Sequence, residues 1–428
     1  MQTKSGLRFS TLCGWSRFVH RHRLEPLPNR WLPQAWRACF GAAATALGLA
    51  AALMMPATSA SALQRSPAAR TVLKSPDRTL AQKFSLIQGA RELADGRLIV
   101  SDFIEERVAV IDFANGGVSD RTRIGAGPDE FRLPGALRFF RGDSTLLVDM
   151  GNNRLDVLDQ DGRIRRSLTP PSPGAAYPAG ADAQGRIYFS IPAWTVRRRA
   201  AGDSVELAIW DPATDSVWTF AMIHGSTPAP QPSGPQDGPR LPMVVFAAQD
   251  AWAVGPDGRV AIVSGADYSV RWLAGGRIVA AGSPIATRRE RVTAEDRTAC
   301  VREFALSSPV GGRGPDGGLG HATAEMNSPA EIERMVRRTT FAETLPFFRA
   351  GDARVDPSGR LWVGTMTPVG EPRRYDVFDR EARRIATIEL EAGRRVLAIG
   401  ARYVYTVVAD DDGLETIERH PMPALPGT

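Results

Sequence analysis

The densest group of polar side chains in the sequence is the segment Asp149–Arg154, which holds a carboxylate, two adjacent amides and a guanidinium. Such a set can bind a polar ligand through several hydrogen bonds at once. The same residues also suit a tight hairpin between two strands, because Asp and Asn bond their own backbone and tolerate a left-handed φ. We favour the hairpin and keep a ligand site as the alternative.

Histidine, cysteine and acidic residues form no local catalytic or metal-binding signature. After residue 62 the histidines His224, His321 and His420 lack the H-x-x-x-H or H-E-x-x-H spacing and are interpreted as surface residues. The segment Asp410–Gly413 lacks the alternating oxygen ligands and the distal Glu of a calcium loop, which predicts an acidic turn. Cys300 falls in a predicted helix, as a half-buried structural thiol. The sequence therefore predicts no metal ligand, and any catalytic residues stay unknown.

The formal charge of +6 is confined to the N-terminal segment. Seven basic residues and one acidic residue precede Leu63, so the rest of the chain carries equal numbers of basic and acidic side chains. A neutral body offers no general attraction to phosphate backbones. Nucleic acid is therefore not an expected partner.

Residues 1–62 have the layout of an export leader. An uncharged run, Ala38–Met55, follows a basic segment that ends at Arg37, and small residues in A-x-A spacing come after it. This order predicts a signal peptide, so residues 63–428 are expected in the periplasm or outside the cell. The apolar run is also nearly long enough to span a bilayer. An uncleaved anchor is therefore the alternative, and the only membrane contact that we expect.

Repeated strand patterns decide the architecture of residues 63–428. Residues 102–112 and 149–159 align without a gap, Asp on Asp and Arg on Arg, at a separation of 47 residues. Short apolar strands recur six times, most of them after a Gly- and Asp-rich turn that supplies the positive φ of a tight hairpin. They are residues 98–100, 146–148, 187–189, 261–263, 361–363 and 404–406. Six such units predict an all-β fold: a six-bladed β-propeller of four-stranded antiparallel blades.

The second of these units resembles an NHL repeat. The resemblance rests on residues 125–134, GAGPDEFRLP, and on residues 148–162, VDMGNNRLDVLDQDG. It covers about residues 79 to 420, with the other units degenerate, and it implies a fold far more than a function. In propellers of this kind the hairpins between second and third strands lie on the ligand-bearing face. The candidate ligand residues implied by this resemblance are Asp102, Arg107, Asn153, Arg154, Tyr268 and Arg374.

One further segment is expected to close the ring of blades, and another is expected to be inserted between two blades. Residues 78–87 precede the first complete unit and are expected to supply the outer strand of the last blade, which would remove an open edge. Residues 284–349 are expected to form a small helical insertion between blades four and five, on one face. One helix is predicted at 293–304. A second begins at Ser328, which caps it, with Pro329 in the first turn and Glu331 closing a capping box.

Two functions fit these observations. The first is an exported NHL-like propeller that binds a protein, peptide or glycan and needs no cofactor. The alternative is a metal-dependent enzyme of lactonase or lyase type. Similar propellers of that type hold calcium or another divalent metal at the mouth of the central channel, through side chains from several blades. We favour the binding module, because the repeat scaffold carries no catalytic motif.

Overall fold

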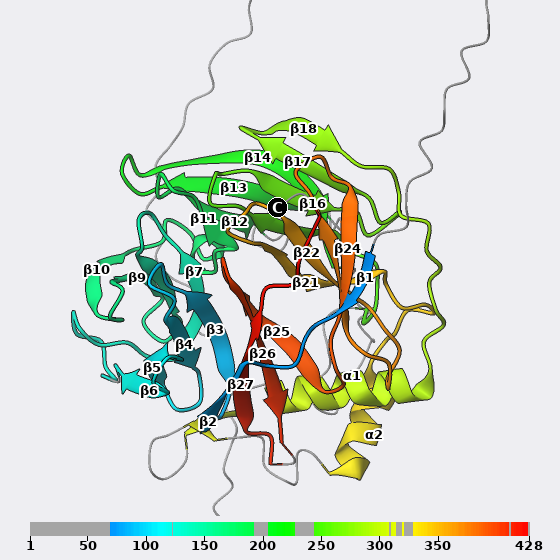
Figure 1. The fold of residues 1–428 in the computed structure, drawn as a ribbon, viewed down its shortest axis with the longest axis horizontal. Coiled ribbons are helices and arrows are strands. Elements are labelled where there is room, and N and C mark those ends of the chain that lie inside the picture. The colour runs from blue at the N-terminus through cyan, green and yellow to red at the C-terminus, as the bar shows by residue number, and fades with distance from the viewer. Residues whose placement is uncertain are drawn as a thin grey trace, which may run out of the picture. The chain divides into compact units, whose positions relative to one another are not determined.

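The computed structural model describes residues 69–121, 123–191, 204–226, 244–307, 310–313, 319–320, 328–410 and 412–426. The expected leader at 1–62 lies outside these residues, as does His321. Most of the described chain forms six four-stranded antiparallel sheets, which follow one another in a ring (Figure 1). The expected fold, a six-bladed β-propeller, is confirmed.

Each blade runs from an inner strand at the hub to an outer strand at the rim. The first three blades are β3 (Ile87–Glu92), β4 (Leu98–Asp102), β5 (Arg107–Asp112) and β6 (Gly117–Asp120); β7 (Pro134–Phe139), β8 (Thr145–Asp149), β9 (Arg154–Leu158) and β10 (Ile164–Leu168); and β11 (Gly180–Ala181), β12 (Ile187–Ile191), β13 (Ser204–Asp211) and β14 (Ser216–His224). The 3-10 helix η1 (Gly174–Ala176) precedes β11.

The last three blades repeat this order. They are β15 (Ala251–Val254), β16 (Val260–Val263), β17 (Val270–Ala274) and β18 (Arg277–Ala281); β21 (Phe348–Val355), β22 (Leu361–Thr365), β23 (Arg374–Phe378) and β24 (Arg384–Glu389); and β25 (Arg394–Ile399), β26 (Tyr403–Ala409) and β27 (Glu415–Pro421), completed by β2 (Arg78–Phe84).

The hydrophobic core is divided into six clusters, one at each junction between neighbouring blades. In β4, Leu98 and Val100 pack towards blade six, while Ile99, between them, packs towards blade two. Alternate residues of a strand point to opposite faces of its sheet. A middle strand is therefore buried on both faces, which explains why these strands read as continuous apolar runs and not as an alternating pattern.

The N-terminal segment closes the ring, as the sequence predicts. Strand β2 pairs antiparallel with β27 and becomes the outer strand of blade six. Its Leu80 and Phe84 are buried in the core shared by blades six and one. Arg419 of β27 donates two hydrogen bonds to Asp77, at 3.0 and 2.8 Å, just before β2 begins.

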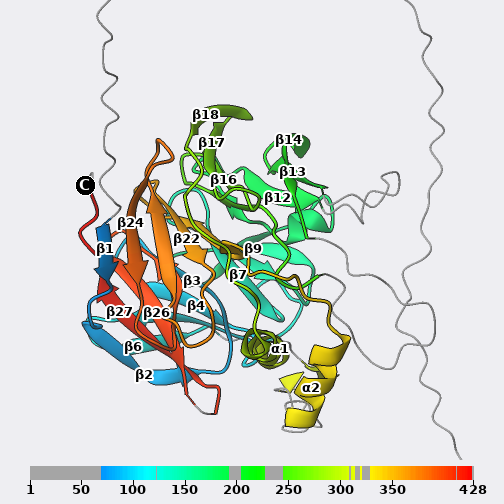
Figure 2. The ribbon, with the colours of Figure 1, turned by 90° about the vertical axis from the view of Figure 1, so that its right-hand side faces the viewer.

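A second N-terminal strand, β1 (Ala69–Val72), is not predicted by the sequence. It pairs parallel with β24 and adds a fifth strand to blade five. Both views of the ribbon show β1 beside β24, while β2 lies beside β27 (Figure 2). The N-terminal segment thus holds the rims of two adjacent blades.

The insertion between blades four and five contains the two predicted helices, α1 (Ala294–Ser307) and α2 (Pro329–Arg338). A short hairpin, β19 (Val310–Arg313) with β20 (Leu319–Gly320), lies between them in the chain. Ser328 caps α2 by accepting a hydrogen bond from Glu331 N, as the capping box predicts. Helix α1 contacts blade five, where Asp296 accepts a hydrogen bond from Val369 N at 3.0 Å. Among the described residues no helix is both long and apolar enough to cross a bilayer.

Candidate functional site

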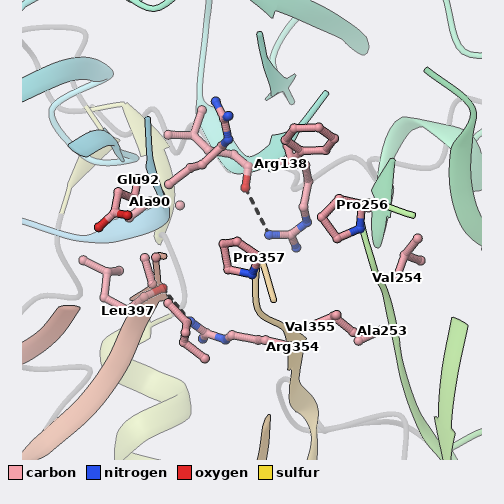
Figure 3. Close-up of a pocket in the computed structure, with 18 of the residues that line it drawn as sticks. Ala90, Glu92, Arg138, Ala253, Val254, Pro256, Arg354, Val355, Pro357 and Leu397 are labelled. Carbon is pink, nitrogen blue, oxygen red and sulfur yellow. Dashed lines mark hydrogen bonds between the residues drawn. The ribbon is translucent and has the colours of Figure 1, made fainter. Parts of the chain in front are cut away.

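A cavity occupies the hub of the ring, where the inner strands of the six blades meet. Its volume is about 940 Å³, and every inner strand, β3, β7, β11, β15, β21 and β25, contributes to its lining (Figure 3). Ligand pockets in proteins commonly fall in this size range. The hub is therefore the first candidate for a ligand site.

Two glycines on the inner strands, Gly89 and Gly351, shape the hub in different ways. At Gly89 a Cβ atom would lie 2.3 Å from Leu137 N, so only glycine lets β3 approach β7 this closely. At Gly351 the situation is the opposite, because a Cβ atom there would meet nothing within 4 Å. Gly351 lines the cavity, so its missing side chain is part of the empty volume.

The lining of the cavity is cationic. Five arginines and two carboxylates face it, which gives a formal net charge of +3. The two carboxylates already have partners. Glu92 accepts hydrogen bonds from Ala401 N and Tyr405 Oη, both at 2.8 Å, and Asp143 pairs with Arg91 at 2.9 Å. Of the other four arginines, Arg354 lies 3.3 Å from Asp352 and Arg395 lies 2.5 Å from Glu415. Arg138 and Arg402 form no ion pair with the described residues.

Three of the arginines occupy the same position in their blades. Arg91, Arg138 and Arg354 each stand seven residues before the first residue of the second strand. Arg91 reaches Asp143 of the next blade. Arg138 instead donates from Nε to Pro178 O and from Nη1 to Leu137 O, each at 3.3 Å. Arg354 donates to Leu397 O and lies 3.3 Å from Asp352.

Arg138 differs from the other two because it has no ion pair within the part of the chain that the structure describes. Its side chain is half-buried beside the cavity. Burial, followed by the nearby positive charge of Arg354, lowers the pKa of Arg138 to about 10 from its ordinary 12.5. The group stays charged at neutral pH, so the hub holds a guanidinium whose charge no carboxylate among the described residues balances.

The six candidate ligand residues implied by the NHL resemblance do not line this cavity. They lie at the hairpins between second and third strands of blades one, two, four and five. Asp102, at the end of β4, accepts hydrogen bonds from two backbone N–H groups of its own hairpin and from two of the segment between β2 and β3, and so joins the two. Arg107, at the start of β5, stacks over Phe84 and lies 3.4 Å from Asp120.

Arg154, Tyr268 and Arg374 are likewise engaged with other protein groups, while Asn153 shapes its own hairpin. Asn153 is exposed with a φ of 51°, as the favoured hairpin interpretation requires. Arg154 donates from Nε to Asp149 at 3.0 Å and from Nη2 to Gly127 O at 3.1 Å, so it fastens the 125–130 loop to its hairpin. Tyr268 is buried and donates to Asp376 at 2.6 Å. Arg374 donates to Glu389 at 3.1 Å.

One interpretation of the histidines is wrong. His420 is not a surface residue: it is 2 % exposed in β27. Its Nδ1 lies 2.7 Å from Lys74 O and its Nε2 lies 2.8 Å from Thr406 Oγ1. Because a buried polar ring needs such partners, His420 ties the N-terminal segment to blade six. The described residues contain no group of three or more His, Cys, Asp or Glu side chains arranged to hold a metal ion.

Two buried carboxylates of blade two, Asp149 and Asp156, predict a specific pH dependence. Asp156 is buried beside Asp149, and burial raises the pKa of Asp156 to about 6 from 3.8. The folded chain therefore keeps a proton between about pH 4 and 6 that the unfolded chain releases, and stability falls as the pH rises through this range. Asp156→Asn removes that cost, so we expect it to stabilise the protein by about 1–3 kcal/mol at pH 7.5.

The check is urea unfolding of both proteins at pH 7.5 and at pH 4.5. We expect the advantage of Asp156→Asn to shrink at the lower pH, where wild-type Asp156 is already protonated. An advantage of the same size at both pH values, or no advantage at either, would contradict the assignment.

Comparisons with known proteins support no assignment of function. No protein-family profile matches the chain, and no curated protein sequence matches it. Among solved structures, a calcium-binding protein, regucalcin, from Agrobacterium tumefaciens strain C58 is 13 % identical with a TM-score of 0.40, covering 84 % of this chain and 99 % of its own. A Bacteroides fragilis NCTC 9343 protein described as exported is 12 % identical with a TM-score of 0.42, covering 83 % and 95 %. Virginiamycin B lyase from Staphylococcus aureus is 10 % identical with a TM-score of 0.34, covering 81 % and 88 %. Likenesses this distant carry no argument about function.

Proposed function

We propose that this chain is an exported propeller that binds a ligand in its hub cavity and acts as a binding module. One observation carries the proposal: a cavity of about 940 Å³, lined from all six blades, has a positively charged lining that includes Arg138, whose charge no carboxylate among the described residues balances. The volume suits a small molecule, or the end of a peptide or glycan chain from a larger partner. The rigid inner strands around it would hold such a ligand without rearrangement.

Export and an NHL-type origin belong to the same proposal. Export is supported by the order of basic, apolar and small residues in 1–62. The NHL origin is supported by the loop at 125–134, which Arg154 fastens to its hairpin. A ligand reaching the hub would then come from the periplasm or the medium.

The alternative, a metal-dependent lactonase or lyase, is less well supported by the charge of the hub. A divalent cation needs several free oxygen ligands. The two carboxylates that face the cavity are engaged with Arg91, Ala401 N and Tyr405. The net positive lining would also repel a cation.

The proposal is tested by filling the cavity. Gly351→Trp places an indole where a Cβ meets nothing within 4 Å, so we expect the variant to fold like the wild type and to lose ligand binding. Gly351→Ala is the matched control, because its single methyl group leaves most of the space open. The measurement is thermal unfolding of all three proteins against peptides, oligosaccharides, organic acids and divalent metals. A ligand at 100 times its Kd stabilises by about 2.7 kcal/mol.

A ligand that stabilises the wild type and Gly351→Ala, but not Gly351→Trp, would support the hub as the site. Equal stabilisation of all three proteins would place the ligand elsewhere. A shift with a divalent metal that a chelator abolishes would favour the enzyme.

A further inference from the structure

We infer that Arg138 and Arg354 form a site for a compact oxyanion, a carboxylate or a phosphate group, in the hub cavity. The inference rests on the proposed function and names the chemistry of its ligand. The candidate hairpin residues take no part in this site.

The geometry brings the two side chains to one space from opposite sides of the ring. Arg138 belongs to β7 of blade two and Arg354 to β21 of blade five, and these are opposite blades in a ring of six. Figure 3 shows both side chains beside the cavity, each fastened by a backbone carbonyl. These carbonyls fix the direction of each guanidinium and leave further N–H groups for a ligand, since each guanidinium has five.

Charge favours an anion between these side chains. Arg138 has no ion pair among the described residues, and Arg354 has only the contact with Asp352 at 3.3 Å. Two guanidinium groups that share a partly enclosed space repel each other more than they would in water. Burial is the main cause of the lowered pKa of Arg138, and the positive charge of Arg354 adds to it. An oxyanion that accepts hydrogen bonds from both arginines would turn the repulsion into two charge-assisted interactions.

Blade one already contains an arginine that is paired with a carboxylate at this position. Arg91 occupies in blade one the position that Arg138 occupies in blade two. There the next blade supplies a carboxylate, and Asp143 accepts a hydrogen bond from Arg91 at 2.9 Å. At Arg138 the described part of the next blade supplies a backbone carbonyl, Pro178 O, in place of a carboxylate. A carboxylate or phosphate from the ligand would complete at Arg138 the pair that Asp143 completes at Arg91.

The experiment titrates inorganic phosphate and, separately, malonate into the full-length protein at constant ionic strength, with chloride as the reference. Arg138→Gln and Arg354→Gln remove the proposed ligands. Arg277→Gln removes an equal charge from an exposed position on β18 and is the matched control. We expect at least one oxyanion to bind the wild type more tightly than chloride does. Binding should weaken roughly tenfold or more in each hub variant and change less than about twofold in Arg277→Gln.

Folding is followed by thermal unfolding without added anion. We expect Arg138→Gln to be at least as stable as the wild type, because Arg138 gives up no ion pair within the described part of the chain. Malonate binding alone would identify a carboxylate ligand, and phosphate binding alone a phosphate ligand. Arg138→Lys should restore only part of the affinity, since lysine lacks the planar fork.

Equal loss of affinity in Arg138→Gln and Arg277→Gln would mean a general charge effect and would overturn the site. The site would also be overturned if neither anion bound better than chloride. The proposed function is tested independently of the oxyanion site. It is supported if a neutral ligand binds the wild type and Gly351→Trp blocks that binding. It falls if every ligand, anions included, binds Gly351→Trp as it binds the wild type.

Discussion

A chain that begins at residue 85, and so lacks β1 and β2, is expected to lose cooperative unfolding and to aggregate. Without β2, the backbone of β27 has no outer partner, and an open strand edge is a template for association. The same truncation removes Leu80 and Phe84 from the core between blades six and one. Burial of two such side chains contributes about 3–6 kcal/mol, a large part of the stability of an ordinary domain.

The comparison is made with chains that begin at residues 63 and 73. The chain from residue 73 lacks only β1 and keeps Leu73 in the core between blades five and six, so it should still unfold cooperatively, at a lower temperature. Circular dichroism and light scattering during heating distinguish these outcomes. A monomeric chain from residue 85 with a sharp transition would show that β2 does not close the ring.

Asp356→Ala is expected to destabilise the protein by about 3–5 kcal/mol, because it leaves a buried charge without its partner. Asp356 is 0 % exposed and lies 2.7 Å from Arg360 Nε, whose side chain is 9 % exposed. Its Oδ2 also accepts a hydrogen bond from Trp362 Nε1 at 3.0 Å, and Trp362 is fully buried. The substitution therefore leaves the guanidinium of Arg360 and the indole N–H of Trp362 without their acceptor inside blade five.

Asp95→Ala is the matched control in blade one. Asp95 pairs with Arg97, which follows the same kind of Gly-containing turn, but the Asp95 side chain is 40 % exposed. Exposed pairs contribute little, so we expect a loss below about 1 kcal/mol. Urea unfolding of both variants gives the two free energies. Equal losses would show that burial of Asp356 does not set the cost.

Blade three has the same pairing of a buried aspartate with the arginine of the first hairpin. Asp182 accepts hydrogen bonds from Arg186 Nε at 2.7 Å and from Tyr188 Oη at 3.0 Å. In both blades a Gly with positive φ precedes the arginine, 86° at Gly185 and 82° at Gly359. A Gly-Arg step stands at the first hairpin of blades one, three, four and five, where its glycine, Gly96, Gly185, Gly258 or Gly359, has a positive φ.

The fold was predictable because each blade is a local unit with its own turn signal. The helical insertion was predictable for the same reason, from the cap at Ser328. Strand β1 was not, since its four residues pair in parallel with β24, more than 300 residues away in the chain. Nothing in a four-residue segment such as ARTV specifies a partner so distant.

The hub cavity was missed because its residues are contributed by six separate strands. A signal did exist. When the blades are aligned on their second strands, Arg91, Arg138 and Arg354 fall at one position. The alignment does not tell which of these arginines pairs with a carboxylate of the next blade. Asp143 belongs to blade two, and it pairs with Arg91 of blade one across the junction between the blades.

The most direct measurement is a crystal structure of the full chain grown with the tightest ligand from the anion titration. We predict electron density for the ligand in the hub cavity, between Arg138 of β7 and Arg354 of β21, with the protein backbone unchanged. Ligand density at the hairpins of Asp102, Arg107, Asn153, Arg154, Tyr268 and Arg374, with an empty hub, would contradict the hub site. That result would return the ligand to the face implied by the NHL resemblance.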